Sequence, residues 1–285
     1  MTRISLRLAA TTALLPLLWA PAAQASQEWS AFSLGAPSVA RTGPVADAQF
    51  EALQQEANEP VSAARRWGAA EAKLMQLLMQ QQWQQALDWL KVAKPDVNAP
   101  EEASGASPLS VACREGQLNL VRELLRHGAS VDQIGVRGFT PMGAAVFGGH
   151  ELVVLELLRK GAKVDAPGAT GQLPLHLASA TGQPRMVALL LKHGADWRAW
   201  NGKGRHALAE AAHFGHIPVM TLLHQAGAPW DAADQFGLNA LHAAAIGMQP
   251  AVIDFLRARG VSSPSMLTDL LIDQVRQGRL VVQTP

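Results

Sequence analysis

Residues 138–165 read GFTPMGAAVFGGHELVVLELLRKGAKVD, and this stretch begins with the signals of a short helix. Thr140 can accept a backbone N–H at a helix start, and Pro141 suits the next position because a helix leaves the donor there unpaired. We therefore predict that a helix begins at these two residues. Gly148 and Gly149 end it after about two turns, because glycine is unfavourable inside a helix.

The rest of the stretch predicts a second helix and a loop. Segment 151–160 carries apolar residues at a spacing that can bury one helix face, namely Leu152, Val153, Leu155, Leu157 and Leu158. Gly161 supplies the left-handed conformation that ends many helices. Residues 162–170 are too few for a third helix and are rich in turn formers, so we expect an extended, projecting loop there.

The same arrangement recurs every 33 residues along the chain. Two glycine series keep this interval: Gly105, Gly138, Gly171, Gly204 and Gly237 precede the first helices, and Gly128, Gly161, Gly194, Gly227 and Gly260 end the second helices. A fixed period of about 20–50 residues is typical of a solenoid, in which each repeat buries its apolar face only against its neighbours.

Two stretches carry a family resemblance. Residues 171–178 read GQLPLHLA, and the preceding repeat runs from Gly149-His150 to Gly161-Ala162. These residues resemble the ankyrin repeat, whose pattern joins threonine-proline-leucine-histidine, paired alanines, glycine-histidine, an aliphatic run and glycine-alanine. The resemblance implies an all-α ankyrin-repeat solenoid of helix-turn-helix units joined by projecting loops.

The spacing divides the chain into a repeat array with terminal segments. The expected order is a signal peptide (1–25), an irregular lead-in (26–60) with one short helix near 46–57, a degenerate capping helix pair (61–104), five repeats (105–137, 138–170, 171–203, 204–236 and 237–269), and a C-terminal capping helix and tail (265–285). The capping helix should run from 265 to 277, with Met266, Leu267, Leu270, Leu271 and Val275 on its apolar side.

The first 25 residues have the pattern of a secretory signal peptide. Arg3 and Arg7 precede the apolar run 8–20, and Ala23-Gln24-Ala25 offers small residues for cleavage after Ala25. The run is shorter than the roughly 20 residues that span a bilayer as a helix, although an uncleaved membrane anchor is the alternative. We therefore expect a bacterial periplasmic protein without membrane insertion after cleavage.

The charge balance of the chain bears on the class of partner. Removal of Arg3 and Arg7 lowers the 24 basic residues to 22, against 23 acidic residues. The mature chain thus lacks the basic surplus typical of nucleic-acid binding, and we expect no nucleic-acid partner.

Cys113 is the single cysteine and cannot form an intrachain disulfide. Its alanine-rich surroundings indicate a small buried side chain.

Nine histidines are the residues closest to a chemical motif. Six fall at repeat positions with structural roles: His176 and His242 at the family's fourth motif position, where the ring bonds local backbone, His150 and His216 in the turn, and His127 and His193 before the helix-ending glycine. His206, His213 and His216 could share a helical face, but no cysteine or acidic cluster completes a zinc site. We expect no enzyme, no catalytic residue, no metal and no cofactor.

The resemblance implies a protein partner at the loop tips and on the exposed, concave side of the first helices. The corresponding residues here are Arg114, Glu115, Val136, Arg137, Phe139, Phe147, Thr181, Trp200, Lys203, Arg205, His213, Phe214, Gln235, Phe236, Leu238 and Ile246. Many are large and apolar, as in protein interfaces, although some could instead pack between neighbouring loops. The expected function is a noncatalytic scaffold for another envelope protein, in a stress-enzyme or toxin-immunity role. The alternative is an enzyme-associated or ligand-binding accessory with a small-molecule or metal site.

Overall fold

The computed structural model describes residues 68–101, 105–135, 138–263 and 266–276 of the 285-residue chain. Within these ranges it contains thirteen α-helices and no strand, which confirms the predicted all-α repeat solenoid. None of these helices combines the length and apolar composition needed to cross a membrane. The predicted signal peptide, the lead-in with its helix near 46–57, and the residues after 276 lie outside the described residues.

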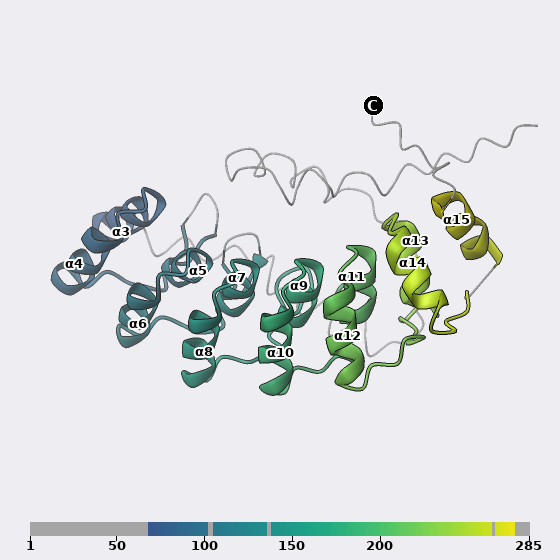
Figure 1. The fold of residues 1–285 in the computed structure, drawn as a ribbon. Helices are drawn as coiled ribbons and strands as arrows, with labels where there is room; N and C mark the ends of the chain where they lie inside the picture. Colours follow the sequence, from purple (N-terminus) through teal and green to yellow (C-terminus); the bar gives the residue numbers. More distant parts are fainter. Residues whose placement is uncertain (1–67, 102–104, 136–137, 264–265, 277–285) are drawn as a thin grey trace, which may run out of the picture. The chain divides into compact units, whose positions relative to one another are not determined.

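The five repeats have helices of almost identical length. The first helices are α5 (Pro108–Arg114), α7 (Pro141–Phe147), α9 (Pro174–Ala180), α11 (Ala207–His213) and α13 (Ala240–Ile246). The second helices are α6 (Leu118–Arg126), α8 (Glu151–Arg159), α10 (Pro184–Lys192), α12 (Ile217–Gln225) and α14 (Pro250–Arg257). Each pair packs together, and each first helix contacts the first helix of the next repeat, so that the pairs follow one another in chain order (Figure 1).

Side-chain caps start most of the first helices. The Thr140 hydroxyl accepts the amide of the residue three positions on, at 3.1 Å, and Asn239 also caps, as its side chain predicts. Leu173 offers no cap. His206, which begins a repeat without proline, caps with its ring, because Nδ1 accepts the Ala209 amide at 3.2 Å.

A third positive-φ series lies in the turn between the two helices of each repeat. Its members are Gly116, Gly149, Gly182, Gly215 and Met248, with φ of 69°, 75°, 66°, 86° and 53°. Positive φ is unfavourable for a residue with a Cβ. The turn between the two helices therefore needs a positive φ in every repeat. In the fifth repeat Met248 adopts it in place of glycine.

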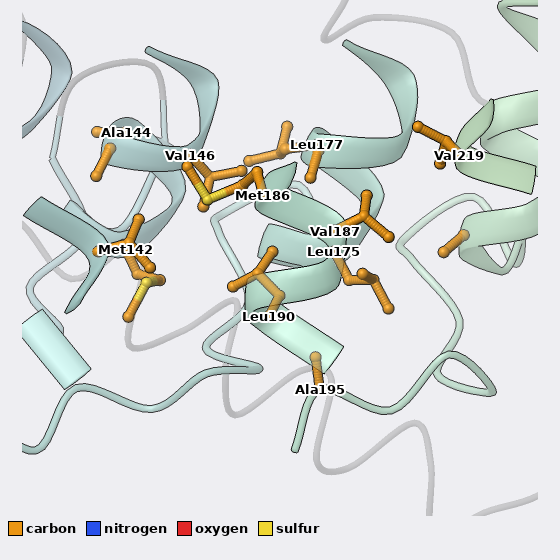
Figure 2. Close-up of a cluster of buried hydrophobic side chains, with 14 of the residues drawn as sticks. Met142, Ala144, Val146, Leu175, Leu177, Met186, Val187, Leu190, Ala195 and Val219 are labelled. Carbon is orange, nitrogen blue, oxygen red and sulfur yellow. The ribbon is translucent and has the colours of Figure 1, made fainter. Parts of the chain in front are cut away.

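The core lies between the two rows of helices. Met142 of α7, Leu175 of α9, and Met186 and Leu190 of α10 are at most 1% exposed (Figure 2). The first helices also bury alanines such as Ala145, Ala178, Ala211 and Ala244. Such small side chains allow neighbouring first helices to lie close together, because interhelical distance depends on the residues at the contact.

The buried face of α8 differs from the predicted one. Leu152 and Leu155 are 66% and 40% exposed, whereas Val154 is fully buried. Glu156 is also buried on this side. The reason is geometric: residues three apart lie on the same side of a helix, and the neighbouring helices cover the side that carries Val153, Val154 and Leu157.

Three further helices lie at the two ends of the array. The pair α3 (Ala69–Met79) and α4 (Trp83–Ala93) packs on α5 and α6, and α15 (Met266–Arg276) packs on α13 and α14. The predicted apolar side of α15 is partly wrong, because Leu270 is 60% exposed while Ile272 is fully buried. Contact with two helices at once selects a face that the apolar pattern alone does not specify.

Candidate protein-binding surface

The projecting loops end in four equivalent tips. In each, a backbone amide donates to the carbonyl four residues later: Gly135 to Phe139, Gly168 to Gln172, Asn201 to Arg205 and Asp234 to Leu238, at 2.7–2.9 Å. We call these segments the 135–139, 168–172, 201–205 and 234–238 tips. The tips recur every 33 residues, as the helices do, so the loops keep the same backbone hydrogen bond from repeat to repeat.

Hydrogen bonds connect each tip to the next. The amides of Ala169, Gly202 and Gln235 donate to the carbonyls of Gly138, Gly171 and Gly204, at 2.7, 3.1 and 3.2 Å. The acceptors belong to the first glycine series, and all three have positive φ. The described residues of the four tips, which exclude 136–137, therefore form one backbone row, and each tip lies just before a first helix.

Two tips are held by a polar side chain where the others have glycine. Asn201 Oδ1 accepts the amides of Lys203 and Arg205 at 2.9 and 3.1 Å. Asp234 Oδ1 accepts those of Phe236 and Leu238 at 2.8 and 2.9 Å. Both side chains are buried. The equivalent positions in the other tips are Gly135 and Gly168, so the 201–205 and 234–238 tips have an additional constraint.

We expect the Asp234→Ala substitution to destabilise the protein by about 2 kcal/mol, because two backbone donors lose a charged acceptor. Asp234→Asn keeps an acceptor oxygen, as Asn201 does one repeat earlier, and should cost about 1 kcal/mol or less. Chemical denaturation of the two variants and the parent measures both effects. Equal losses in the two variants would show that the bonds from Asp234 do not stabilise the tip.

The predicted binding residues fall into two groups of exposure. Trp200, Lys203, Gln235 and Phe236 are exposed, with Trp200 and Phe236 at 54% and 64%. The half-buried residues are Arg114, Glu115, Phe139, Phe147, Thr181, Arg205, His213, Phe214, Leu238 and Ile246. Val136 and Arg137 lie outside the described residues. The described members lie in the tips, directly before a tip in the case of Trp200, or at the C-terminal ends of the first helices. We call the row of tips, together with the residue that directly precedes each tip, the loop row.

Several half-buried members have partners within the chain. Phe139 and Phe147 stack with ring centroids 5.6 Å apart. Arg114 and Glu115 form an ion pair at 2.9 Å. The Thr181 hydroxyl donates to a carbonyl of its own helix at 2.7 Å. These contacts orient the side chains and reduce what they can offer to a partner, so Trp200 and Phe236 are the most available large apolar groups of the predicted set.

Buried polar groups lie beneath the 201–205 tip. Asn201 Nδ2 donates to the buried Glu210 carboxylate at 2.8 Å. His176 donates from Nε2 to the carbonyl of Arg205 at 3.0 Å, and burial lowers its pKa to about 4. The predicted local backbone bond of His176 is thus wrong, because its ring reaches the next repeat. His242 instead meets the Thr268 hydroxyl of α15 at 2.7 Å.

The positive charges of the 201–205 tip act on α11. Burial, followed by the charge of Arg205, lowers the pKa of His213, and the charge of Lys203 acts in the same direction. His213 itself bonds the carbonyl of Ala243 through Nδ1 at 3.2 Å. The end of α11 therefore lies within the electrostatic field of the two loop cations.

The remaining candidates for chemistry have structural surroundings. Within the described ranges, no three His, Cys, Asp or Glu side chains gather as a metal site would require. Cys113 is fully buried, and burial raises the pKa of its thiol. His150 and His216 donate from Nε2 to the carbonyls of Arg114 and Ala180, at 2.9 and 3.0 Å, and so tie adjacent repeats together.

A charged pocket lies on the second-helix side. Its volume is about 230 Å³ and its lining consists of Arg122, Arg126, Glu156, Arg159 and Lys160. The hydrogen bond and charge of Arg159, with those of Arg122, hold the pKa of the buried Glu156 carboxyl below its ordinary value. Glu123 pairs with Arg126 at 2.7 Å. The pair of Arg122 with Glu156, at 3.2 Å, joins α6 to α8, whereas the other two pairs lie within one helix. We therefore assign the pocket a packing role.

Sequence reasoning missed three features of the loop row. Asn201 and Asp234 were not selected, although an asparagine or aspartate side chain that accepts the backbone amide two residues later is a recognised turn signal. Ile134, one repeat length before Pro167 and two before Trp200, is 47% exposed and belongs beside the predicted apolar residues. Comparison of equivalent positions across the repeats would have found all three.

The comparison with family models gives one match. The model described as ankyrin repeats (3 copies) matches residues 62–168, 137–201, 154–234 and 175–266. These overlapping matches cover most of the chain and include every repeat described above. No curated protein matches the chain.

Proposed function

The chain belongs to the ankyrin-repeat family, and from this premise we propose that it is a noncatalytic scaffold of the bacterial periplasm that binds another envelope protein. Ankyrin repeats are protein-binding scaffolds, and their proteins are generally noncatalytic. The periplasmic location is supported by the signal-peptide pattern of residues 1–25. A stress enzyme or a secreted toxin is the class of partner that the family resemblance suggests.

The observation that carries the proposal is the composition of the loop row. Trp200 and Phe236 are large apolar side chains that remain more than half exposed on a hydrogen-bonded backbone. Exposed aromatic groups beside arginine and lysine are typical of the residues that dominate protein interfaces. Because the backbone beneath them is already ordered, a partner would lose little free energy in fixing it.

The test is capture of the partner from intact cells. The full chain, expressed in its own host, is crosslinked, purified and identified with its partner by mass spectrometry, and the same spectra report where the mature chain starts. We expect a chain that begins at Ser26 and one specific envelope protein. The triple substitution of Phe147, Trp200 and Phe214 by alanine should abolish this capture and leave the helical content unchanged.

A matched control uses exposed apolar residues elsewhere. Val92, Leu152 and Leu155 are 81%, 66% and 40% exposed and lie on second helices or the N-terminal pair. Their combined replacement by alanine should leave capture intact. Equal capture by the parent and by the Phe147, Trp200 and Phe214 variant would refute the assigned surface, and a chain retaining residues 1–25 would refute the cleaved signal.

A further inference from the structure

Adjacent loop tips present different chemistry at equivalent positions. Lys203 and Arg205 occupy the third and fifth residues of the 201–205 tip, and Phe236 and Leu238 occupy those of the 234–238 tip. In the 168–172 tip the same positions carry Thr170 and Gln172. In chain order, the tip with the cationic pair directly precedes the tip with the apolar pair. The 168–172 tip, which comes before both, has neither pair.

The backbone brings the two pairs side by side. The amide of Gln235 donates to the carbonyl of Gly204 at 3.2 Å, which joins the two tips directly. Asn201 and Asp234 each accept the two amides of the residues that carry these side chains. The pairs are therefore displayed from backbone that is ordered before any partner arrives, which lowers the entropic cost of binding.

The two cations lack an acidic partner in the chain. Within the described ranges, neither Lys203 nor Arg205 forms an ion pair, whereas Arg114, Arg122 and Arg159 all do. Glu210 lies buried beneath the tip, where it accepts from Asn201. The positive charge of this tip is thus uncompensated, and exposed aromatic residues stand directly before it, at Trp200, and in the joined tip, at Phe236.

We propose that the 201–205 and 234–238 tips form a binding site for a protein segment in which acidic residues flank an aromatic or large aliphatic side chain. Carboxylates of the segment would pair with Lys203 and Arg205, and its apolar side chain would cover Phe236, Leu238 and Trp200. This inference rests on the proposed scaffold function and specifies the chemistry of its partner. Charge complementarity selects the acidic segment, because a basic one would meet like charge.

The test selects peptides from a random dodecamer library displayed on phage, with the immobilised mature chain as the bait. We expect enriched peptides to carry aspartate or glutamate next to phenylalanine, tryptophan or leucine. The double variant Lys203→Glu/Arg205→Glu should bind those peptides at least about tenfold more weakly and should select basic peptides instead. Higher salt should weaken binding to the parent, because Lys203 is exposed and Arg205 is only half-buried, so dissolved ions can screen both charges.

The control is a double charge reversal at two exposed lysines away from the tips, Lys163→Glu/Lys192→Glu, which should leave the enriched sequences unchanged. If Lys203→Glu/Arg205→Glu does not fold, Lys203→Gln/Arg205→Gln removes the charge with less disturbance and should weaken binding in the same direction. Enriched peptides without an acidic excess, or binding that is unchanged in the charge variants, would overturn the inference.

The outcomes separate this inference from the scaffold function. If replacement of Phe147, Trp200 and Phe214 abolishes capture of the cellular partner while the charge variants retain it, the surface is correct and the acidic chemistry is wrong. If none of these variants reduces capture, both the surface and its chemistry are wrong.

Discussion

Gly171→Ala should destabilise the protein by roughly 2–5 kcal/mol, because the added methyl group would meet both an unfavourable backbone conformation and a neighbouring backbone. Gly171 has φ of +70°, where a Cβ costs about 1–2 kcal/mol. A Cβ there would also lie 2.7 Å from the Gly202 Cα and 2.8 Å from its nitrogen. Backbone atoms cannot turn aside as a flexible side chain can, so the 168–172 and 201–205 tips would have to separate.

Gly194→Ala is the matched control. Gly194 has φ of +92° but a Cβ at that position would meet nothing within 4 Å. Its cost should be limited to the conformational term of about 1–2 kcal/mol. Chemical denaturation measures the two free energies of unfolding, and amide exchange at Gly202 reports whether its bond to Gly171 is weakened. Equal losses in the two variants would mean that close contact between tips does not contribute.

Acidification should destabilise the protein through its buried histidines. Burial lowers the pKa of His176 from 6.5 to about 4, despite the opposing charge of Glu210. The unfolded chain therefore binds the proton first, so stability is complete above pH 6.5 and declines as the pH falls toward 4. The difference corresponds to about 3 kcal/mol. Burial also lowers the pKa of His206, His213 and His242, which adds to the loss with the same sign.

His176→Gln identifies the contribution of this one ring. Glutamine retains an N–H donor for the carbonyl of Arg205 but does not titrate. The free energy of unfolding, measured by urea denaturation between pH 4 and pH 8, should depend less on pH by up to about 1.4 kcal/mol per pH unit. Any constant loss from imperfect packing appears at pH 8 and is subtracted. A variant with the same pH dependence as the parent would exclude His176 as a source.

The helices could be predicted because their signals are local. Thr140 and Pro141 mark a helix start, Gly161 marks an end, and the expected segment 151–160 agrees with α8 to within one residue. The buried side of a helix was predicted less well, as Leu155 and Leu270 show. Apolar spacing limits the possible faces, but the neighbouring helices decide which one is covered.

The candidate surface shows the same division between local and tertiary information. Trp200 and Phe236 were selected from their place in the repeat, and both are exposed. Their support by Asn201 and Asp234 was missed, and the partner of His176 was placed locally although it lies in the next repeat. In each case a side chain bonds a backbone group that lies nearby only once the turn has formed or the repeats have stacked.

The sequence by itself determined the repeat length, the helix-turn-helix unit and the positions of its glycines, because helix signals and left-handed turns depend on a few adjacent residues. Only the tertiary structure decided which side chains the stacked repeats bury and how the loops join. The carbonyl of Gly204 meets the amide of Gln235, 31 positions on, once the repeats stack. That contact places Lys203 and Arg205 beside Phe236 and Leu238.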